Sequence, residues 1–268
     1  MLLNAIVIVL RETLEAGILM SVLLTVGRQL EIQGRWFAVA LIAGIAGSFL
    51  YARYLGAISQ WFDYAGQEVV NALLQYSLYW CLVVICVLSF NWQKLPLPSS
   101  RHVMATFLGI SVVLACVREG SEIMIFFLGY LTDRDVMVKA MTSGFVGLMI
   151  GVSVGALCYY IIMMQRKPIS RIIQLSLMML VAGGMVIQAT QLLVQVDWLP
   201  STEPVWNTSF FLSESSIIGQ LVYAIFGYEA SPTQIEALMY IGSLLLIPVI
   251  VIGVHYFLKS RRVSSELT

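Results

Sequence analysis

The feature of this sequence that most constrains its fold is a series of long apolar runs separated by short polar turns. The runs lie at residues 2–27, 36–58, 69–90, 104–130, 138–164, 170–195 and 235–258. A helix of about 20 apolar residues is long enough to cross the hydrocarbon core of a bilayer. Only 11% of the residues are charged, against about 25% in soluble domains. The sequence predicts an all-α polytopic membrane protein with seven transmembrane helices.

The chain is predicted to form one transmembrane domain over residues 1–268. A polar connection broken by prolines, 196–234, separates the sixth run from the last span at 235–258. The end of this connection reads IIGQLVYAIFGYEASP and predicts a short interfacial or re-entrant helix. Net charge is zero and no basic block is present, which argues against nucleic acid as a partner and leaves membrane lipid as the surrounding medium.

Lysine and arginine predict the orientation of these spans. Ten of the fifteen fall in loops and the tail on one side of the membrane, and three fall on the other side. The side that is richer in Lys and Arg faces the cytoplasm. We therefore expect a multi-pass protein of the cytoplasmic (inner) membrane with its N-terminus outside and its C-terminus in the cytoplasm. Most acidic residues fall outside, where they either gather cations or simply avoid the positive side.

An internal repeat accompanies the apolar runs. RETLE at 11–15 matches REGSE at 118–122, a shift of 107 residues. The same shift maps the small residues of the second run onto those of the fifth: Ala40, Gly44 and Ser48 onto Gly147, Gly151 and Gly155. Small residues at this spacing let helix backbones approach closely. Residues 1–95 and 104–195 are therefore predicted to be two three-helix repeats, inverted because each has an odd number of spans.

The repeated motif places three charges on one helical face. Arg11 and Glu15 are four residues apart and Glu12 and Glu15 are three apart, so all three lie within about 100° of the helix circumference. Both copies fall near the middle of a span, where each charge costs roughly 2.5–3.5 kcal/mol. Each motif must therefore face a partner inside the bundle, and the other copy is the obvious partner.

The chemistry of the two motifs favours a metal site. It has four candidate ligands and two supporting arginines: Glu12, Glu15, Glu119 and Glu122, with Arg11 and Arg118. Carboxylate oxygens suit hard cations such as Fe³⁺, Mn²⁺, Mg²⁺ or Ca²⁺, and arginine orients carboxylates through paired hydrogen bonds. An Arg–Glu network that only locks helices together, or a proton relay, would use the same residues. The sequence has only two histidines, His102 and His255, and neither is near a motif, which argues against haem and di-iron sites.

Polar residues also share one face of the third and of the sixth run. They are Glu68, Asn71 and Gln75 in the third run and Gln188, Gln191 and Gln195 in the sixth. These residues could line an outer vestibule that leads to the motifs. Hydrogen bonding between helices is the alternative role.

Two Arg-Glu-x-x-Glu motifs inside membrane spans resemble the hallmark of the oxidase-dependent iron permeases, the fungal high-affinity iron permease and its bacterial EfeU-type relatives. The stretch IFGYEASP at 225–232 is similar to that family's segment before the last span. The resemblance implies iron uptake into the cell, with the four glutamates as ligands of the transported Fe²⁺ or Fe³⁺ and with no permanently bound cofactor. It also implies a separate extracytoplasmic protein that binds iron or acts as oxidase or reductase, so that the chain is a transporter and not an enzyme.

The residues alone leave three other functions open. A divalent-cation or cation/proton transporter would use the same carboxylates, and metal competition would distinguish it. A membrane ferroxidase would turn over iron as a pure protein, although the scarcity of histidine argues against it. A non-transporting membrane subunit with a structural Arg–Glu cluster would lose assembly, not transport, when a glutamate is replaced by glutamine.

Overall fold

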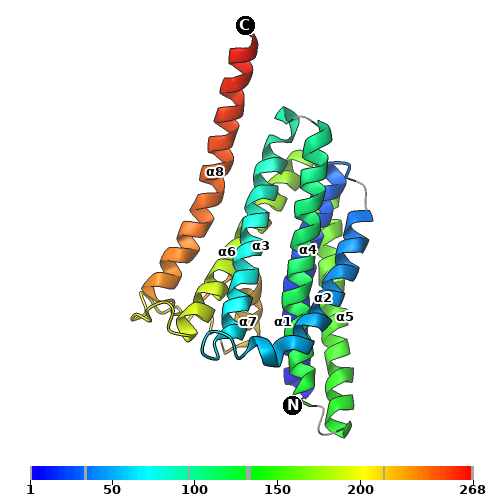
Figure 1. Cartoon of the computed structure of the whole chain (residues 1–268), viewed down its shortest axis with the longest axis vertical. Coiled ribbons are helices and arrows are strands. Elements are labelled where there is room, and N and C mark those ends of the chain that lie inside the picture. Colours follow the sequence, from blue (N-terminus) through cyan, green and yellow to red (C-terminus); the bar gives the residue numbers. More distant parts are fainter. Residues whose placement is uncertain (1, 33–34, 96, 131–133, 214, 267–268) are drawn as a thin grey trace.

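The protein, seen in a computed structural model, is a bundle of long helices (Figure 1). The structure describes residues 2–32, 35–95, 97–130, 134–213 and 215–266. The long helices are α1 (Leu2–Gln29), α2 (Arg35–Ile58), α3 (Gly66–Asn91), α4 (Leu97–Leu128), α5 (Arg134–Met164), α6 (Lys167–Gln195) and α8 (Gln234–Glu266). A 3₁₀ turn, η1 (Trp92–Lys94), follows α3, and the short helix α7 (Ile217–Phe226) precedes α8. The predicted connections at 33–34 and 131–133 lie outside the described residues.

The composition of these helices makes the chain a multi-pass membrane protein. Six of them, α2 to α6 and α8, are long and apolar enough to cross a bilayer. Among the described residues, most large apolar side chains that are exposed belong to α2, α5 and α8, for example Phe49, Phe145, Leu157, Leu238 and Val249. Such a surface suits lipid and not water. Helix α1 has 28 residues but carries the charged motif, so its membrane crossing, and with it the count of seven, stays a prediction.

The short helix α7 confirms the helix predicted near the end of the long connection. The side chain of Ser216 accepts a hydrogen bond from the backbone N–H of Gly219 and caps the first turn. Gly227 ends the helix with a positive φ of 66°, a conformation that costs glycine little. Its backbone also lies against that of Gly184 on α6, so α7 is held against the bundle at this end.

The bundle is built from two extensively packed helix pairs, α1 with α5 and α2 with α4, and from α3 against α6. Small residues make the close approaches. Ser21 on α1 donates a hydrogen bond to the carbonyl oxygen of Gly155 on α5 at 2.5 Å, and Ser48 on α2 donates to that of Cys116 on α4 at 2.6 Å. The predicted small-residue stripes therefore lie at helix contacts.

The pairing of these helices has the symmetry that an inverted repeat requires. In the predicted repeat, α1 corresponds to α4, α2 to α5 and α3 to α6. The packed pair α1–α5 then corresponds to the packed pair α4–α2, and the pair α3–α6 corresponds to itself. The two chain ends lie at opposite ends of the bundle (Figure 1), as an odd number of crossings requires. These observations support the repeat, which stays a prediction, and they agree with opposite locations for the N- and C-termini.

Helix α8 packs on the outside of α6 and α3. The phenol of Tyr79 on α3 donates a hydrogen bond to the carbonyl oxygen of Ser243 at 3.0 Å, and His255 contacts Asn91 through its Nδ1 atom at 3.0 Å. Helix α8 thus covers the side of α3 and α6 that α1 and α4 leave open, and it closes the bundle without contributing to the charged motifs.

The contact between α1 and α5 predicts opposite effects of alanine at two glycines. A Cβ atom added at Gly147 would lie 2.5 Å from the carbonyl oxygen of Ile6 and 3.0 Å from the backbone nitrogen of Leu10. Because backbone cannot move aside cheaply, we expect Gly147→Ala to destabilise the protein by about 1–3 kcal/mol. A Cβ at Gly253 on α8 would meet nothing within 4 Å.

Thermal unfolding in detergent tests this difference. The control Gly253→Ala should keep or slightly raise the melting temperature, because alanine favours the helix over glycine by up to about 1 kcal/mol. Equal melting temperatures for the two variants would contradict the close contact of α1 and α5.

Candidate functional site

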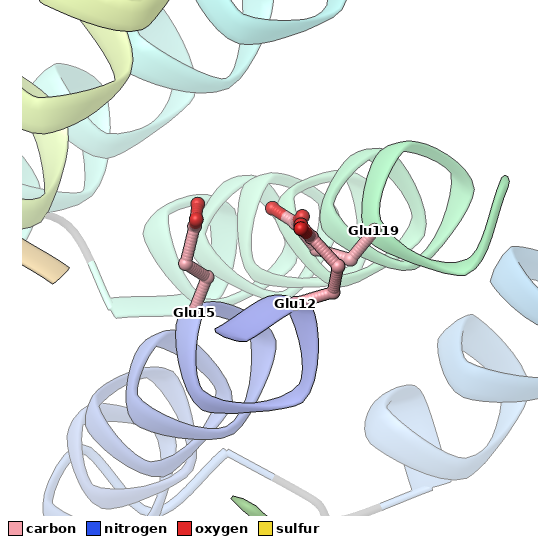
Figure 2. Close-up of side chains that lie close together, drawn as sticks. All are labelled: Glu12, Glu15 and Glu119. Carbon is pink, nitrogen blue, oxygen red and sulfur yellow. The ribbon is translucent and has the colours of Figure 1, made fainter. Parts of the chain in front are cut away.

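The two charged motifs meet inside the bundle, one on α1 and the other on α4. Figure 2 shows the side chains of Glu12 and Glu15 from α1 and of Glu119 from α4 with their carboxylates gathered in one place. One carboxylate oxygen from each of the three lies within 4.8 Å of the others. The spacing of the motif explains this, because residues three apart share a face of the helix. The two motifs therefore lie against each other in the structure, as predicted.

These three carboxylates are buried. Glu12 is 0% exposed, Glu119 is 2% exposed and Glu15 is 6% exposed. Carboxylates are almost never buried so completely unless they are paired or bind a metal. The site therefore needs positive charge, from the protein or from a ligand.

Arg118 supplies part of that charge. Its Nη1 atom donates to Oε2 of Glu15 at 2.8 Å and to Oε1 of Glu119 at 2.5 Å. Its Nη2 atom lies 3.3 Å from Oε1 of Glu122, four residues along the same helix. One guanidinium thus holds three carboxylates, and the contact with Glu15 joins α4 to α1.

The second arginine lies nearer to the surface. Arg11 pairs with Glu12 at 2.5 Å and reaches Glu122 at 3.8 Å. The side chains of Arg11 and Glu122 are 33% and 25% exposed. Of the four predicted ligands, three therefore converge in the interior, and Glu122 stands at the edge of the cluster, between the two arginines.

Two carboxylate oxygens of the cluster have no hydrogen-bond partner among the described residues. They are Oε2 of Glu12 and Oε2 of Glu119, and both are buried. Leaving a buried polar atom unpaired costs about 1–3 kcal/mol, and more for a charged group. A cation bound between Glu12 and Glu119 would give both of these atoms a partner.

Two glutamines adjoin the cluster. Gln75 on α3 donates to Oε1 of Gln188 on α6 at 2.8 Å, and Gln188 lies 3.4 Å from Oε2 of Glu15 through its Nε2 atom. Both glutamines are buried. The structure places this predicted vestibule pair beside the carboxylates, with a hydrogen bond between α3 and α6, and its role in a vestibule stays a prediction.

A cavity of about 350 Å³ lies on the side of the cluster where Glu122 is exposed. Glu122 itself forms part of its wall, with Glu68 and Asn71 from α3 and Gln195 from α6. Asn71 is held in place by the phenol of Tyr51, which donates to its Oδ1 atom at 3.0 Å. Three of the six predicted vestibule residues thus do line a cavity that leads to the motif.

Gln191, the remaining vestibule candidate, contacts α7 and the segment that follows it. Its Nε2 atom donates to Glu229 at 2.5 Å and its Oε1 atom accepts a hydrogen bond from Tyr223. Tyr223 lies on α7 and Glu229 in the segment that follows it. Neither residue is among the predicted site residues, although both belong to the stretch IIGQLVYAIFGYEASP, where a carboxylate and a phenol stand out in an apolar segment.

Comparison with known protein families identifies the family of this chain. The model of the iron permease FTR1 family matches residues 99–265, which is more than half of the chain and includes the motif at 118–122. No curated protein and no solved structure matches the chain. The resemblance to the iron permeases that the sequence suggested is thereby confirmed. The chain belongs to the iron permease FTR1 family.

Proposed function

We propose that this protein moves iron across the cytoplasmic membrane into the cell through the carboxylate cluster between α1 and α4. The observation that carries the proposal is the convergence of three buried glutamates from two helices, with oxygen atoms within 4.8 Å of one another, in a chain of an iron permease family. The fourth glutamate, Glu122, lies where the cluster meets the cavity and passes the ion inward. Iron is cargo here and not a resident cofactor.

The donor set suits this cargo. Four glutamates and two arginines carry a formal charge of −2, which a divalent ion neutralises and a trivalent ion turns to +1. Carboxylate oxygens are hard ligands that bind hard cations well. The unpaired Oε2 atoms of Glu12 and Glu119 accept the ion first, because no hydrogen bond has to be broken there.

Arg118 acts in this proposal as a tethered cation that iron displaces. Its guanidinium contacts Glu15 and Glu119, so it offsets part of the negative charge of the cluster in the absence of iron. An incoming ion takes over these carboxylates, and the guanidinium is left with Glu122. When iron leaves, Arg118 pairs with Glu15 and Glu119 again and prevents a buried, uncompensated charge.

The route is open on one side of the cluster and closed on the other. The cavity with Glu68 reaches Glu122, whereas the packed side chains of Leu19, Leu23 and Leu82 fill the bundle beyond Glu15. With the N-terminus outside, as the charges of the loops predict, this arrangement faces outward. Release into the cell then requires the two halves to separate at the apolar layer, as in other transporters with inverted repeats. A separate extracytoplasmic protein delivers the iron or changes its oxidation state.

The central prediction concerns Glu15 and Glu119. Glu15→Gln and Glu119→Gln should each reduce iron binding and uptake by about 10–100-fold or more, because each removes a charged ligand, and losing even a group that only supports a ligand costs that much. The measurement is radioactive-iron binding to the purified protein and uptake into proteoliposomes, with Fe²⁺ and Fe³⁺ offered separately and Mn²⁺ as competitor.

The matched control for these variants is Glu203→Gln, which removes an exposed carboxylate from the 196–234 connection. It should bind and transport iron like the unaltered protein. Normal binding by either cluster variant that folds would falsify the assignment of the site. Equal preference for Mn²⁺ and iron would instead indicate a general cation transporter.

A second prediction separates the vestibule from the ligands. Glu68 lines the cavity and is not one of the four motif glutamates, so Glu68→Gln should raise the half-saturating iron concentration about two- to fivefold and leave the maximal rate unchanged. The effect should shrink at high salt, because exposed charges are screened. An unchanged half-saturating concentration at low salt would show that Glu68 attracts no iron.

A third prediction follows from the ion pairs of Arg118. Arg118→Met leaves Glu15 and Glu119 buried without their partner, which should cost about 3–5 kcal/mol of stability. Thermal unfolding in detergent measures the loss, and adding Glu119→Gln to the same chain should restore part of it. A melting temperature that does not change in the single variant would mean that these ion pairs do not hold α1 and α4 together.

A further inference from the structure

A second cavity lies at the other end of the bundle, away from Glu122. It has a volume of about 390 Å³ and is formed where α1 and α3 end and α6 begins. Gln29 at the end of α1 is fourteen residues beyond Glu15, which corresponds to about 21 Å along a helix. The cavity is therefore separate from the carboxylate cluster.

The charge of this cavity is opposite to that of the cluster. Lys167 and Arg171 from the first turns of α6 contribute to its wall, and none of the described residues that line it is acidic. Both side chains lie beside the N-terminus of α6, where Pro168 stands in the first turn. Unpaired backbone N–H groups and the helix dipole make such an N-terminus attractive to anions. A cation would be repelled here.

A buried side chain points to a ligand independently of the helix terminus. Gln174 borders the cavity and is 2% exposed. Its Nε2 atom has no hydrogen-bond partner among the described residues. Gln29 and the buried Ser170, in contrast, are joined by a hydrogen bond of 2.6 Å. A buried donor without a partner beside a cavity calls for an acceptor, and a ligand or a water molecule can supply one.

We propose that this cavity binds a phosphate group, either the headgroup phosphate of an anionic lipid or free phosphate. Arg171 offers a guanidinium that matches phosphate oxygens, Lys167 adds a second positive charge and Gln174 adds a neutral donor. Trp92 also lines the cavity, and tryptophan at the end of a membrane helix marks the level of lipid headgroups. The binding of an anion here ties together the ends of α1, α3 and α6.

The test uses the full-length, iron-free protein and three variants. Arg171→Gln removes the guanidinium, and Gln174→Leu removes the unpaired donor at similar volume. Arg166→Gln is the control, because Arg166 is exposed one residue before α6 and does not line the cavity. Each protein is titrated with inorganic phosphate by calorimetry in detergent. Each is also placed in phosphatidylcholine nanodiscs with added phosphatidylglycerol, and the lipid it retains is measured by native mass spectrometry.

We expect Arg171→Gln to weaken binding at least about tenfold, Gln174→Leu to weaken it less, and Arg166→Gln to leave it unchanged. Loss of phosphate binding in the first two variants would identify free phosphate as the ligand, and loss of phosphatidylglycerol retention alone would identify a lipid. Absence of both kinds of binding in the unaltered protein would overturn the proposal. The same loss in Arg166→Gln as in Arg171→Gln would also overturn it, because only general positive charge would then be involved.

Discussion

The structure depends on one buried contact, the guanidinium of Arg118 between Glu15 of α1 and Glu119 of α4. A buried charge is tolerated only with a partner at hydrogen-bonding distance, so α1 and α4 must meet at this level. The small residues of α2 and α5 then decide how closely their neighbours pack on either side. Helices α3 and α6 pack beside the cluster and contribute Gln75 and Gln188. The amide of Gln188 reaches Glu15 and adds a neutral hydrogen-bonding group to the cluster.

In the proposed function, the contacts that stabilise the cluster without iron also compete with iron. Arg118 and iron would share Glu15 and Glu119, so the strength of this ion pair would limit the affinity for iron. A transporter benefits from that limit, because an ion that binds too tightly is not released. The unpaired oxygens of Glu12 and Glu119 would make up part of this affinity for iron, because the first coordination bonds to them break no contact with Arg118.

The sequence predicted the helices and the meeting of the motifs because both follow from large energies. Apolar runs must be helical in a bilayer, and charges in mid-span must find each other. It could not place Glu122 at the cavity edge or Gln188 beside Glu15, because these positions depend on the rotation of each helix about its axis. That rotation results from many small packing terms between helices distant in sequence. The cavity at Gln174 was missed for the same reason, since its lining comes from three helix ends.

The charges of α1 also bear on the order in which the chain is made. Arg11 has Glu12 as a neighbour, but the partner of Glu15 is Arg118, which is synthesised 103 residues later. While the ribosome is still extending the chain towards α4, α1 therefore lacks the contact that makes Glu15 compatible with lipid. We expect that α1, a predicted span, settles in the bilayer only after α4 has been synthesised.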